Sequence, residues 1–336
     1  MANRNIIIIM TLSVVLCASV AGGRTYYVDP NGSNNANGLS WDSAFKTIQK
    51  GIIASTDGDV VEVNEGTYYG PLYIGWKNIT VRGLAPNDWD VVAATVIDGN
   101  GATDTVLFEL TDANLIGFTV TGGSRGIHSD NGSDAAVRHC IITGNARGVV
   151  GDTANVTATS CIIRNNSDEG MFANYAGLIA RSNFIYDNNE GITIIGPYTG
   201  GILRNNTIVN NRNYGIRCAN DATVSIVNCI VWDNGDGNDI SGCSTSYSCI
   251  KDPNDAAGNG NITSDPRFVR ADNNDFHINR NSPCVNAGDP NEDYAGQVDI
   301  DGKTRVVDAR IDIGADEINA LPPDAKPLAA KKQSRN

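Results

Sequence analysis

Short stretches of alternating apolar and polar residues recur along the chain every 21 to 23 residues. Six such units begin at Phe118, Cys140, Cys161, Asn183, Asn206 and Cys229. The third residue of every unit is Val or Ile, as expected where a strand directs a β-branched side chain into a core. No helical repeat explains a unit of this length that is so rich in Asn and Gly, so the pattern predicts a strand followed by a turn in each unit.

The residues that follow each strand are equally regular. Five units carry an asparagine at this position, namely Asn145, Asn166, Asn188, Asn211 and Asn234. In most units a glycine and then an apolar residue come next, which indicates a corner that turns back into the core. Stacked asparagines can hydrogen-bond one another while tolerating a bent backbone. One unit cannot bury its own apolar face, so the units are expected to stack with strands paired about 4.8 Å apart.

These features predict an all-β protein, a single-stranded parallel β-helix of about nine or ten coils of roughly 22 residues. The coils are assigned to residues 57–250 and an N-terminal cap to residues 22–56, in which a helix from Ser43 to Ala54, with the serine as N-cap, covers the edge of the first coil. The pattern fades after Asp252, which predicts an irregular C-terminal cap. The β-helix domain as a whole is assigned to residues 22–320, with its C-terminal cap at 251–320.

The two ends of the chain carry different signals. Arg4 precedes an apolar run that ends at Cys17, and small residues follow, which predicts a signal peptide over residues 1–21. We therefore expect a bacterial protein that is secreted, periplasmic or bound at the cell surface. No later stretch approaches 18 apolar residues, so no membrane span is expected. Residues 321–336 predict a flexible tail.

Charge and composition narrow the possible partners. The 25 basic and 38 acidic residues give a formal net charge of −13, which argues against nucleic acid because a polyanion requires a basic surface. With 41% hydrophobic residues, disorder is excluded. We expect a monomer.

Cysteine pairing cannot be complete, because seven of the eight cysteines remain after removal of the signal peptide. Cys243 and Cys249 are the best candidate for a disulfide. Cys140, Cys161 and Cys229 are predicted to be buried and reduced in one interior column, since side chains stacked on parallel strands have poor disulfide geometry.

The stacked N-x-I-x-x-N-x-x-x-G-I units over residues 114–240 resemble the pectate-lyase-like right-handed parallel β-helix superfamily. The start, YYVDPNGSNNANGLSWDSAFKTIQKGI, and the end, with SPCVNAGDP, VDIDG and IDIGADE, resemble secreted bacterial choice-of-anchor Q proteins. This resemblance implies a right-handed coil and contact with glycans. If the protein is an enzyme, the resemblance implies that carboxylates hold Ca²⁺ against an acidic sugar. It also implies that a Lys or Arg side chain removes the proton next to the uronate carboxylate. The superfamily also includes hydrolases, epimerases and adhesins.

Candidate bases are few, because lysine is absent from residues 78–250. Arg138, Arg181 and Arg204 fall in one column, with Thr159 between the first two. Arg181 and Arg204, together with His139, are the candidate catalytic residues. The alternative is that the arginines pack along the outer sheet and pair with acids, and that the histidine is structural.

Carboxylates form a second cluster. Glu169 and Glu190 occupy consecutive rungs about 5 Å apart, and Asp168 and Asp187 lie near them in sequence. Like charges this close splay into water, share a proton or bind a cation, and carboxylate oxygens suit Ca²⁺. The four acids are the candidate metal ligands, with solvated surface charge as the alternative.

Aromatic side chains suggest a surface for sugars. Tyr186, Trp232 and Arg164 fall in one outward column and are the candidate substrate-binding residues. Two functions follow. The first is a secreted protein that binds an acidic polysaccharide and cleaves it by cation-assisted β-elimination. The alternative is a non-catalytic structural or adhesion protein of the cell envelope or matrix.

Overall fold

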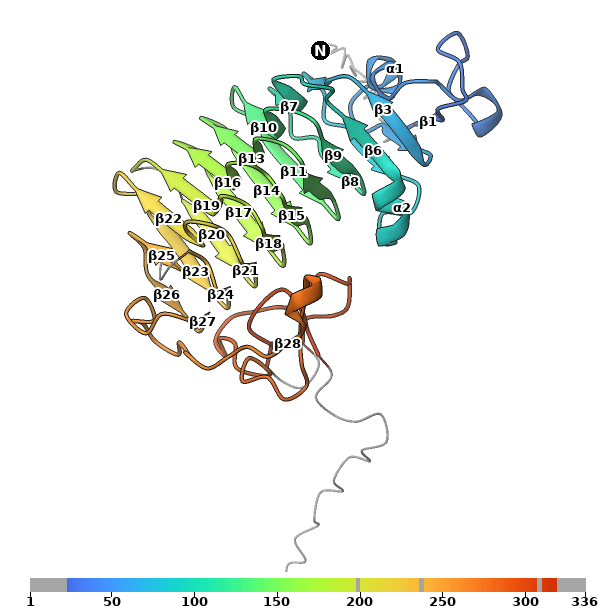
Figure 1. The fold of residues 1–336 in the computed structure, drawn as a ribbon. Coiled ribbons are helices and arrows are strands. Elements are labelled where there is room, and N and C mark those ends of the chain that lie inside the picture. The colour runs from blue at the N-terminus through green and yellow to red at the C-terminus, as the bar shows by residue number, and fades with distance from the viewer. Residues whose placement is uncertain (1–22, 198–199, 236–238, 307–309, 319–336) are drawn as a thin grey trace, which may run out of the picture.

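A computed structural model of the chain describes residues 23–197, 200–235, 239–306 and 310–318, which wind into a stack of coils (Figure 1). Three long parallel sheets run along the described stack, and each coil contributes one strand to each sheet. These sheets contain ten, nine and eight strands, so about eight coils have all three sides. The predicted parallel β-helix is confirmed. The predicted signal peptide and tail lie outside the described residues.

Sheet A consists, in spatial order, of β1 (Thr25–Val28), β2 (Val60–Val63), β5 (Thr80–Gly83), β8 (Asn114–Ile116), β11 (Asp134–Arg138), β14 (Asn155–Thr159), β17 (Leu178–Arg181), β20 (Gly201–Arg204), β23 (Val224–Val227) and β26 (Thr245–Ser246). Sheet B consists of β3 (Gly66–Tyr69), β6 (Thr95–Asp98), β9 (Thr119–Thr121), β12 (Ile141–Thr143), β15 (Ile162–Arg164), β18 (Phe184–Tyr186), β21 (Thr207–Val209), β24 (Ile230–Trp232) and β27 (Cys249–Ile250). Sheet C consists of β4 (Leu72–Gly75), β7 (Asp104–Glu109), β10 (Arg125–Asp130), β13 (Arg147–Asp152), β16 (Glu169–Asn174), β19 (Glu190–Ile195), β22 (Ile216–Ala219) and β25 (Ile240–Ser241).

Short helices lie at the N-terminal end. The capping helix α1 spans Ile48–Ala54 and packs against β1, β2 and β4, with Ile48 and Ile52 buried. It begins later than predicted, because Ser43 ends a 3-10 turn (Trp41–Ser43) and the chain then runs extended to the N-cap, Thr47. A second helix, α2 (Trp89–Ala94), lies beside β6 and β9. No helix among the described residues is long and apolar enough to cross a membrane.

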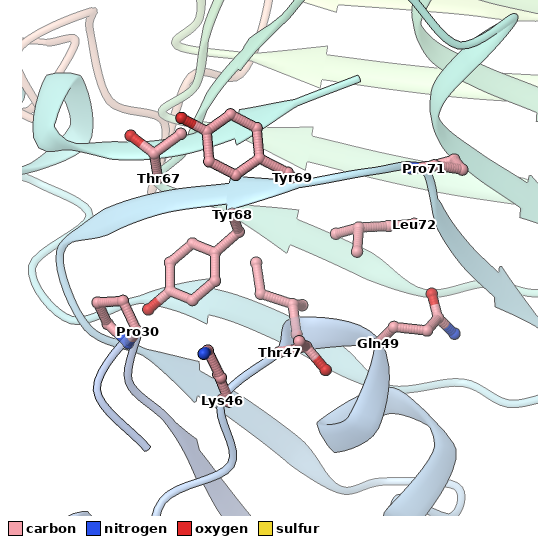
Figure 2. Close-up of a pocket in the computed structure, with 10 residues that line it drawn as sticks. Pro30, Lys46, Thr47, Gln49, Thr67, Tyr68, Tyr69, Pro71 and Leu72 are labelled. Carbon is pink, nitrogen blue, oxygen red and sulfur yellow. The ribbon is translucent and has the colours of Figure 1, made fainter. Parts of the chain in front are cut away.

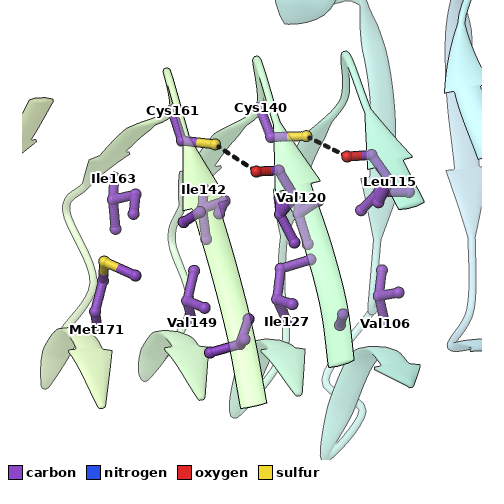
Figure 3. Close-up of a cluster of buried hydrophobic side chains, with 14 of the residues drawn as sticks. Val106, Leu115, Val120, Ile127, Cys140, Ile142, Val149, Cys161, Ile163 and Met171 are labelled. Carbon is purple, nitrogen blue, oxygen red and sulfur yellow. Dashed lines mark hydrogen bonds between the residues drawn. The ribbon is translucent and has the colours of Figure 1, made fainter. Parts of the chain in front are cut away.

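The core inside the coils consists of columns of like side chains (Figure 3). Ile142 on β12 pairs in register with Val120 on β9 and with Ile163 on β15, and all three are fully buried. The buried, reduced state predicted for the cysteine column is confirmed for Cys140, Cys161 and Cys229. The thiols of Cys140 and Cys161 donate to backbone carbonyl groups of the preceding coil, as Figure 3 shows.

The predicted asparagine column forms a hydrogen-bonded ladder between sheets B and C. The amide oxygen of Asn188 accepts bonds from the backbone and the side chain of Asn166, and Asn188 in turn donates to Asn211. The same pattern continues from Asn211 to Asn234. The ladder ends on Asp239, whose carboxylate takes the place of the next amide. Every side chain in the ladder is buried, so the ladder satisfies backbone groups that water cannot reach.

The disulfide differs from the prediction. Cys218 bonds Cys243, with Cα atoms 5.7 Å apart, and Cys249 is a buried free thiol. The reason is the coil geometry. Cys218 lies on β22 in sheet C, next to the turn of the following coil that contains Gly242 and Cys243. Cys249 belongs to β27 in sheet B.

The C-terminal cap folds back along the stack. It contains an antiparallel pair, β28 (Phe268–Arg270) and β29 (Asp275–Ile278), joined by a 3-10 turn (Ala271–Asn273). Its Phe276, Ile300 and Ala315 pack on the outer face of sheet B, against side chains of β18, β21 and β24. Figure 1 shows the cap beside this part of the stack. The side chain of Ser182 donates to the carbonyl group of Val298 across this contact. The cap therefore covers one outer face of the coils.

Candidate functional site

The residues that end four neighbouring strands of sheet A form a straight column on its outer face. Arg138, Thr159, Arg181 and Arg204 pair in register from β11 to β20, as the sequence predicts. Their neighbours in the strands, among them Ala180 and Leu203, point into the core, so these four side chains point outward. We call them the arginine column. Consecutive rungs are about 4.8 Å apart, which places two guanidinium groups side by side at one end.

The arginine column carries more positive than negative charge. Arg204 Nη1 donates to Glu292 Oε2 of the C-terminal cap at 2.6 Å. Arg181 and Arg138 make no side-chain hydrogen bond or ion pair with any described residue. Partial burial lowers the pKa of Arg181, and the positive charge of Arg204 lowers it further. The negative charge of Glu292 opposes this change. The column therefore offers a half-buried guanidinium group that makes no hydrogen bond or ion pair with a described residue, although Glu292 lies near enough to act on its charge.

Spare hydrogen-bonding groups lie where the arginine column meets the cap. Within the described part of the chain, Arg204 Nε and both polar side-chain atoms of Asn205 are buried without a partner. The residues above and below Asn205 in the same corner column, Ser182 and Asn228, do bond the cap. A pocket of about 320 Å³ opens on the cap next to this contact, lined in part by Glu292. The junction is polar and has donors available for water or an anion.

The structure separates His139 from the two candidate arginines. The residue occupies the corner that follows β11, with a left-handed backbone, and its ring centroid lies 6.0 Å from that of Trp89 in α2. Burial lowers the pKa of His139, with a further decrease from Arg138. This surrounding matches the structural alternative for the histidine.

The acidic rungs are confirmed in register, but their charges are compensated. Glu169 on β16 pairs with Glu190 on β19. Arg147 Nε lies 2.6 Å from Glu169 Oε2, and Arg217 Nε lies 2.9 Å from Glu190 Oε2. Thr193 also donates to Glu190. Burial raises the pKa of Glu169, and the bond from Arg147 opposes the rise.

Calcium does not fit these four acids. Arginines already bind Oε2 of Glu169 and Oε2 of Glu190, and Asp168 Oδ2 lies 3.6 Å from Arg147 Nε. Asp187 lines a separate polar pocket of about 270 Å³, and burial raises its pKa. Arg147 was the sequence signal for this ion pair, because it occupies the same column as the two glutamates, one rung before Glu169.

The expected aromatic surface is contradicted at Tyr186, because the cap covers this residue. Tyr186 is only 6% exposed, and its ring centroid lies 5.0 Å from that of Phe276. Trp232 packs against the same cap residues, and Arg164 lies beside Tyr186 on the next rung. Tyr186 therefore cannot stack on a sugar ring. Sequence periodicity could not reveal this, since the covering segment lies outside the repeats.

One cluster was not predicted from the sequence. His277, Asp301 and Asp316 bring ligand-type atoms within 4.8 Å of one another, the one such group among the described residues. Hydrogen bonds to Asp301 and Asp275 raise the pKa of His277 to about 9, against the effect of burial. The cluster is therefore an ion-pair network around a protonated histidine. The D-I-D-G motif, Asp299 to Gly302, contributes Asp301 to this cluster, and Asp299 accepts hydrogen bonds from backbone groups.

Another pocket, of about 320 Å³, lies at the N-terminal end between α1 and β3 (Figure 2). Its walls are mostly apolar and include Pro30, Tyr68 and Leu72, with Lys46 at one side. Burial raises the pKa of Tyr68, whose hydroxyl group donates to the carbonyl group of Asn64. Figure 2 shows Tyr69 on the opposite side of β3 from Tyr68. None of the residues predicted for chemistry lines this pocket.

Comparisons with known proteins identify the architecture. The family model described as right handed beta helix region matches residues 97–276. The solved structure of pectate lyase Pel9A is 17% identical, with a TM-score of 0.60 over 90% of this chain and 98% of that one. A pectin methylesterase from Aspergillus niger and a rhamnogalacturonan lyase are 15% and 16% identical, with TM-scores of 0.41 and 0.33, covering 72% and 68% of this chain and 83% and 68% of their own. No curated protein sequence matches the chain. At these identities the similarity to the pectate lyase shows the fold alone.

Proposed function

Because the chain belongs to the right-handed β-helix family, we propose that it binds an acidic polysaccharide along the arginine column on the outer face of sheet A. The observation that carries the proposal is Arg181, a half-buried cation that forms no ion pair or side-chain hydrogen bond with a described residue. Guanidinium groups bind carboxylates through charge-assisted, often bidentate hydrogen bonds. Because the cations lie on a line parallel to the coil axis, a chain of uronate residues lying along that line can pair with them in succession.

Glu292 supports the choice of a carboxylate as ligand. Its contact with Arg204 shows how a carboxylate sits at the end of the arginine column. The remaining guanidinium groups, Arg181 and Arg138, would take the carboxylates of the sugar. The fold of pectate lyase Pel9A is consistent with a polysaccharide ligand.

Cleavage is the catalytic extension of the proposal. A base that removes the proton next to a uronate carboxylate starts a β-elimination. Arg181, whose pKa is lowered chiefly by burial, is the residue that we propose for this role. A non-catalytic role in the envelope or matrix is the second candidate. It is favoured because no group of carboxylates that could hold a metal lies at the arginine column within the described residues. In both cases we propose that residues 1–21 direct export.

The ligand class can be tested by electrophoresis of the purified protein through gels that contain a polysaccharide. Polygalacturonate and alginate should retard the protein, and a neutral dextran should not. Absorbance of unsaturated uronate products, measured with and without Ca²⁺, distinguishes a lyase from a binding protein. Equal migration in all gels would overturn the proposal.

A further inference from the structure

The corner between sheets C and A carries a second surface with different chemistry. Each coil turns there through a residue with a left-handed backbone, and five consecutive corners are Trp76, Leu110, Asn131, Thr153 and Tyr175. Trp76 is 71% exposed and Tyr175 is 52% exposed. They are separated by four rungs, roughly 19 Å along the coil axis. Exposed aromatic rings on one line are a binding surface for flat, partly apolar ligands.

Both rings are held in place by their surroundings. Trp76 Nε1 donates to the hydroxyl oxygen of Tyr73 at 3.0 Å, and that hydroxyl group donates to Glu109 Oε2 at 2.7 Å. Tyr175 lies against the next corner, Gly196, where an added Cβ would come within 2.9 Å of the ring. Fixed rings lose little entropy when a ligand stacks on them.

A row of carboxylates lies between the two rings. Glu109, Asp130 and Asp152 end β7, β10 and β13 on consecutive rungs, and all are partly exposed. None of the three forms an ion pair with a described residue. Side-chain amides of Asn131 and Asn174 donate to the first and the third at 2.7 and 2.9 Å. The row is therefore a line of negative charges at strand spacing without a protein counter-ion.

We propose that this surface, the corner tract of Trp76, Tyr175 and the three carboxylates, binds a polysaccharide of amino sugars with free ammonium groups. The glycan lies parallel to the coil axis, its ring faces stack on Trp76 and Tyr175, and its ammonium groups pair with the carboxylates. Uronate chains are repelled by the same row. The corner tract thus selects the opposite charge to that of the arginine column, and the protein presents two surfaces for two kinds of glycan.

The test is calorimetric titration with a glucosamine hexamer and with its fully N-acetylated counterpart at mildly acidic pH. The wild type should bind the cationic hexamer at least about tenfold more tightly. Glu109→Gln, Asp130→Asn and Asp152→Asn combined should abolish that preference. The triple change Asp42→Asn, Asp90→Asn and Asp272→Asn alters three exposed acids elsewhere, removes the same charge and should leave the preference unchanged.

The aromatic rings are tested separately. Trp76→Asn and Tyr175→Asn should each weaken binding of both hexamers about tenfold, because a stacking contact is lost. Asparagine tolerates the left-handed corner, so melting temperatures should be unchanged. Tyr69→Asn removes an exposed ring outside the corner tract and should have no effect. Equal binding of the two hexamers by the wild type, no binding, or equal losses in the control variants would overturn the proposal, whatever the result with polygalacturonate.

Discussion

Several charged side chains on the outer faces of the coils form ion pairs with neighbours one rung away. Glu169 is the clearest case, since repulsion from Glu190 was expected and the ion pair with Arg147 replaces it. The sequence shows which residues share a column but not which way a long side chain turns. Arg147 stacks on Phe172 of the next coil, 4.3 Å from the ring centroid, and thereby reaches Glu169.

Glu169→Gln therefore tests whether the ion pair with Arg147 outweighs the repulsion between Glu169 and Glu190. Loss of the ion pair should lower the free energy of unfolding by about 1 kcal/mol, because Arg147 remains partly solvated. Asp168→Asn is the matched control, and its longer contact of 3.6 Å with Arg147 predicts a smaller loss. Urea denaturation measures both. Unchanged or higher stability in Glu169→Gln would show that repulsion between the two glutamates dominates.

His277 predicts a dependence of stability on pH. Its pKa is raised from 6.5 to about 9 in the folded protein, chiefly by Asp301, so its contribution is complete below pH 6.5 and is lost as the pH rises through about 9. Asp275 and Asp316 also face it, and Lys303 binds Asp301. Because the side chain is about one third exposed, we expect a contribution of about 2 kcal/mol.

The measurement is the free energy of unfolding between pH 6 and pH 10 for the wild type and His277→Gln. Burial raises the pKa of Glu317 to about 8. Ionisation of this buried group therefore lowers the free energy of unfolding of both proteins over the lower part of this pH range. The difference between the two curves isolates the histidine, and it should shrink towards high pH. A constant difference would contradict the protonated state.

At the scale of elements, the asparagine ladder links the coils. Asn188 accepts two bonds from Asn166 and donates to the carbonyl groups of Ile163 and Tyr186 and to Asn211. Asn188→Ala leaves these buried groups unpaired and should cost about 3 kcal/mol in thermal or urea unfolding. Asn213→Ala removes an exposed amide contact and should cost less than about 0.5 kcal/mol. Similar losses in the two variants would mean that the ladder does not stabilise the coils.

Much of the arrangement of strands and turns in the coils could be predicted from the sequence. The repeat determines strand, turn and register because each column places one residue type directly above the next, as in Ile142, Ile163 and the cysteines. Local exceptions escaped prediction. The start of α1 depends on Phe45, which bridges Val28 in an extended conformation, and the partner of Cys243 depends on coil geometry that spacing alone does not encode.

At the scale of the whole molecule, the C-terminal cap decides which outer faces are available. It hides Tyr186, and among the described residues its Glu292 pairs with Arg204 but not with Arg138 or Arg181. Neither result follows from the repeats, because the cap has no periodicity of its own. The cap also supplies Glu292 to the arginine column. The position of the candidate column could thus be predicted, but its neighbours could not.

Phe276→Ala tests the docking of the cap. The ring is buried against Phe268 and Tyr186, so its removal should cost about 4 kcal/mol. Hydrogen exchange should accelerate first in β28 and β29, while the strands of sheet A keep their protection. Val269→Ala, at an exposed position on β28, serves as the control. Simultaneous loss of protection in coils and cap would show that they unfold as one unit.

The central claim is that the arginine column binds a uronate chain. Its most direct test is calorimetric titration of oligogalacturonate into the wild type, Arg138→Gln with Arg181→Gln, and Arg82→Gln, the control on the same sheet that Glu62 already neutralises. We predict binding by the wild type that weakens with salt, a loss of at least about tenfold in the double variant, and an unchanged affinity in the control. Full affinity in the double variant would contradict the account.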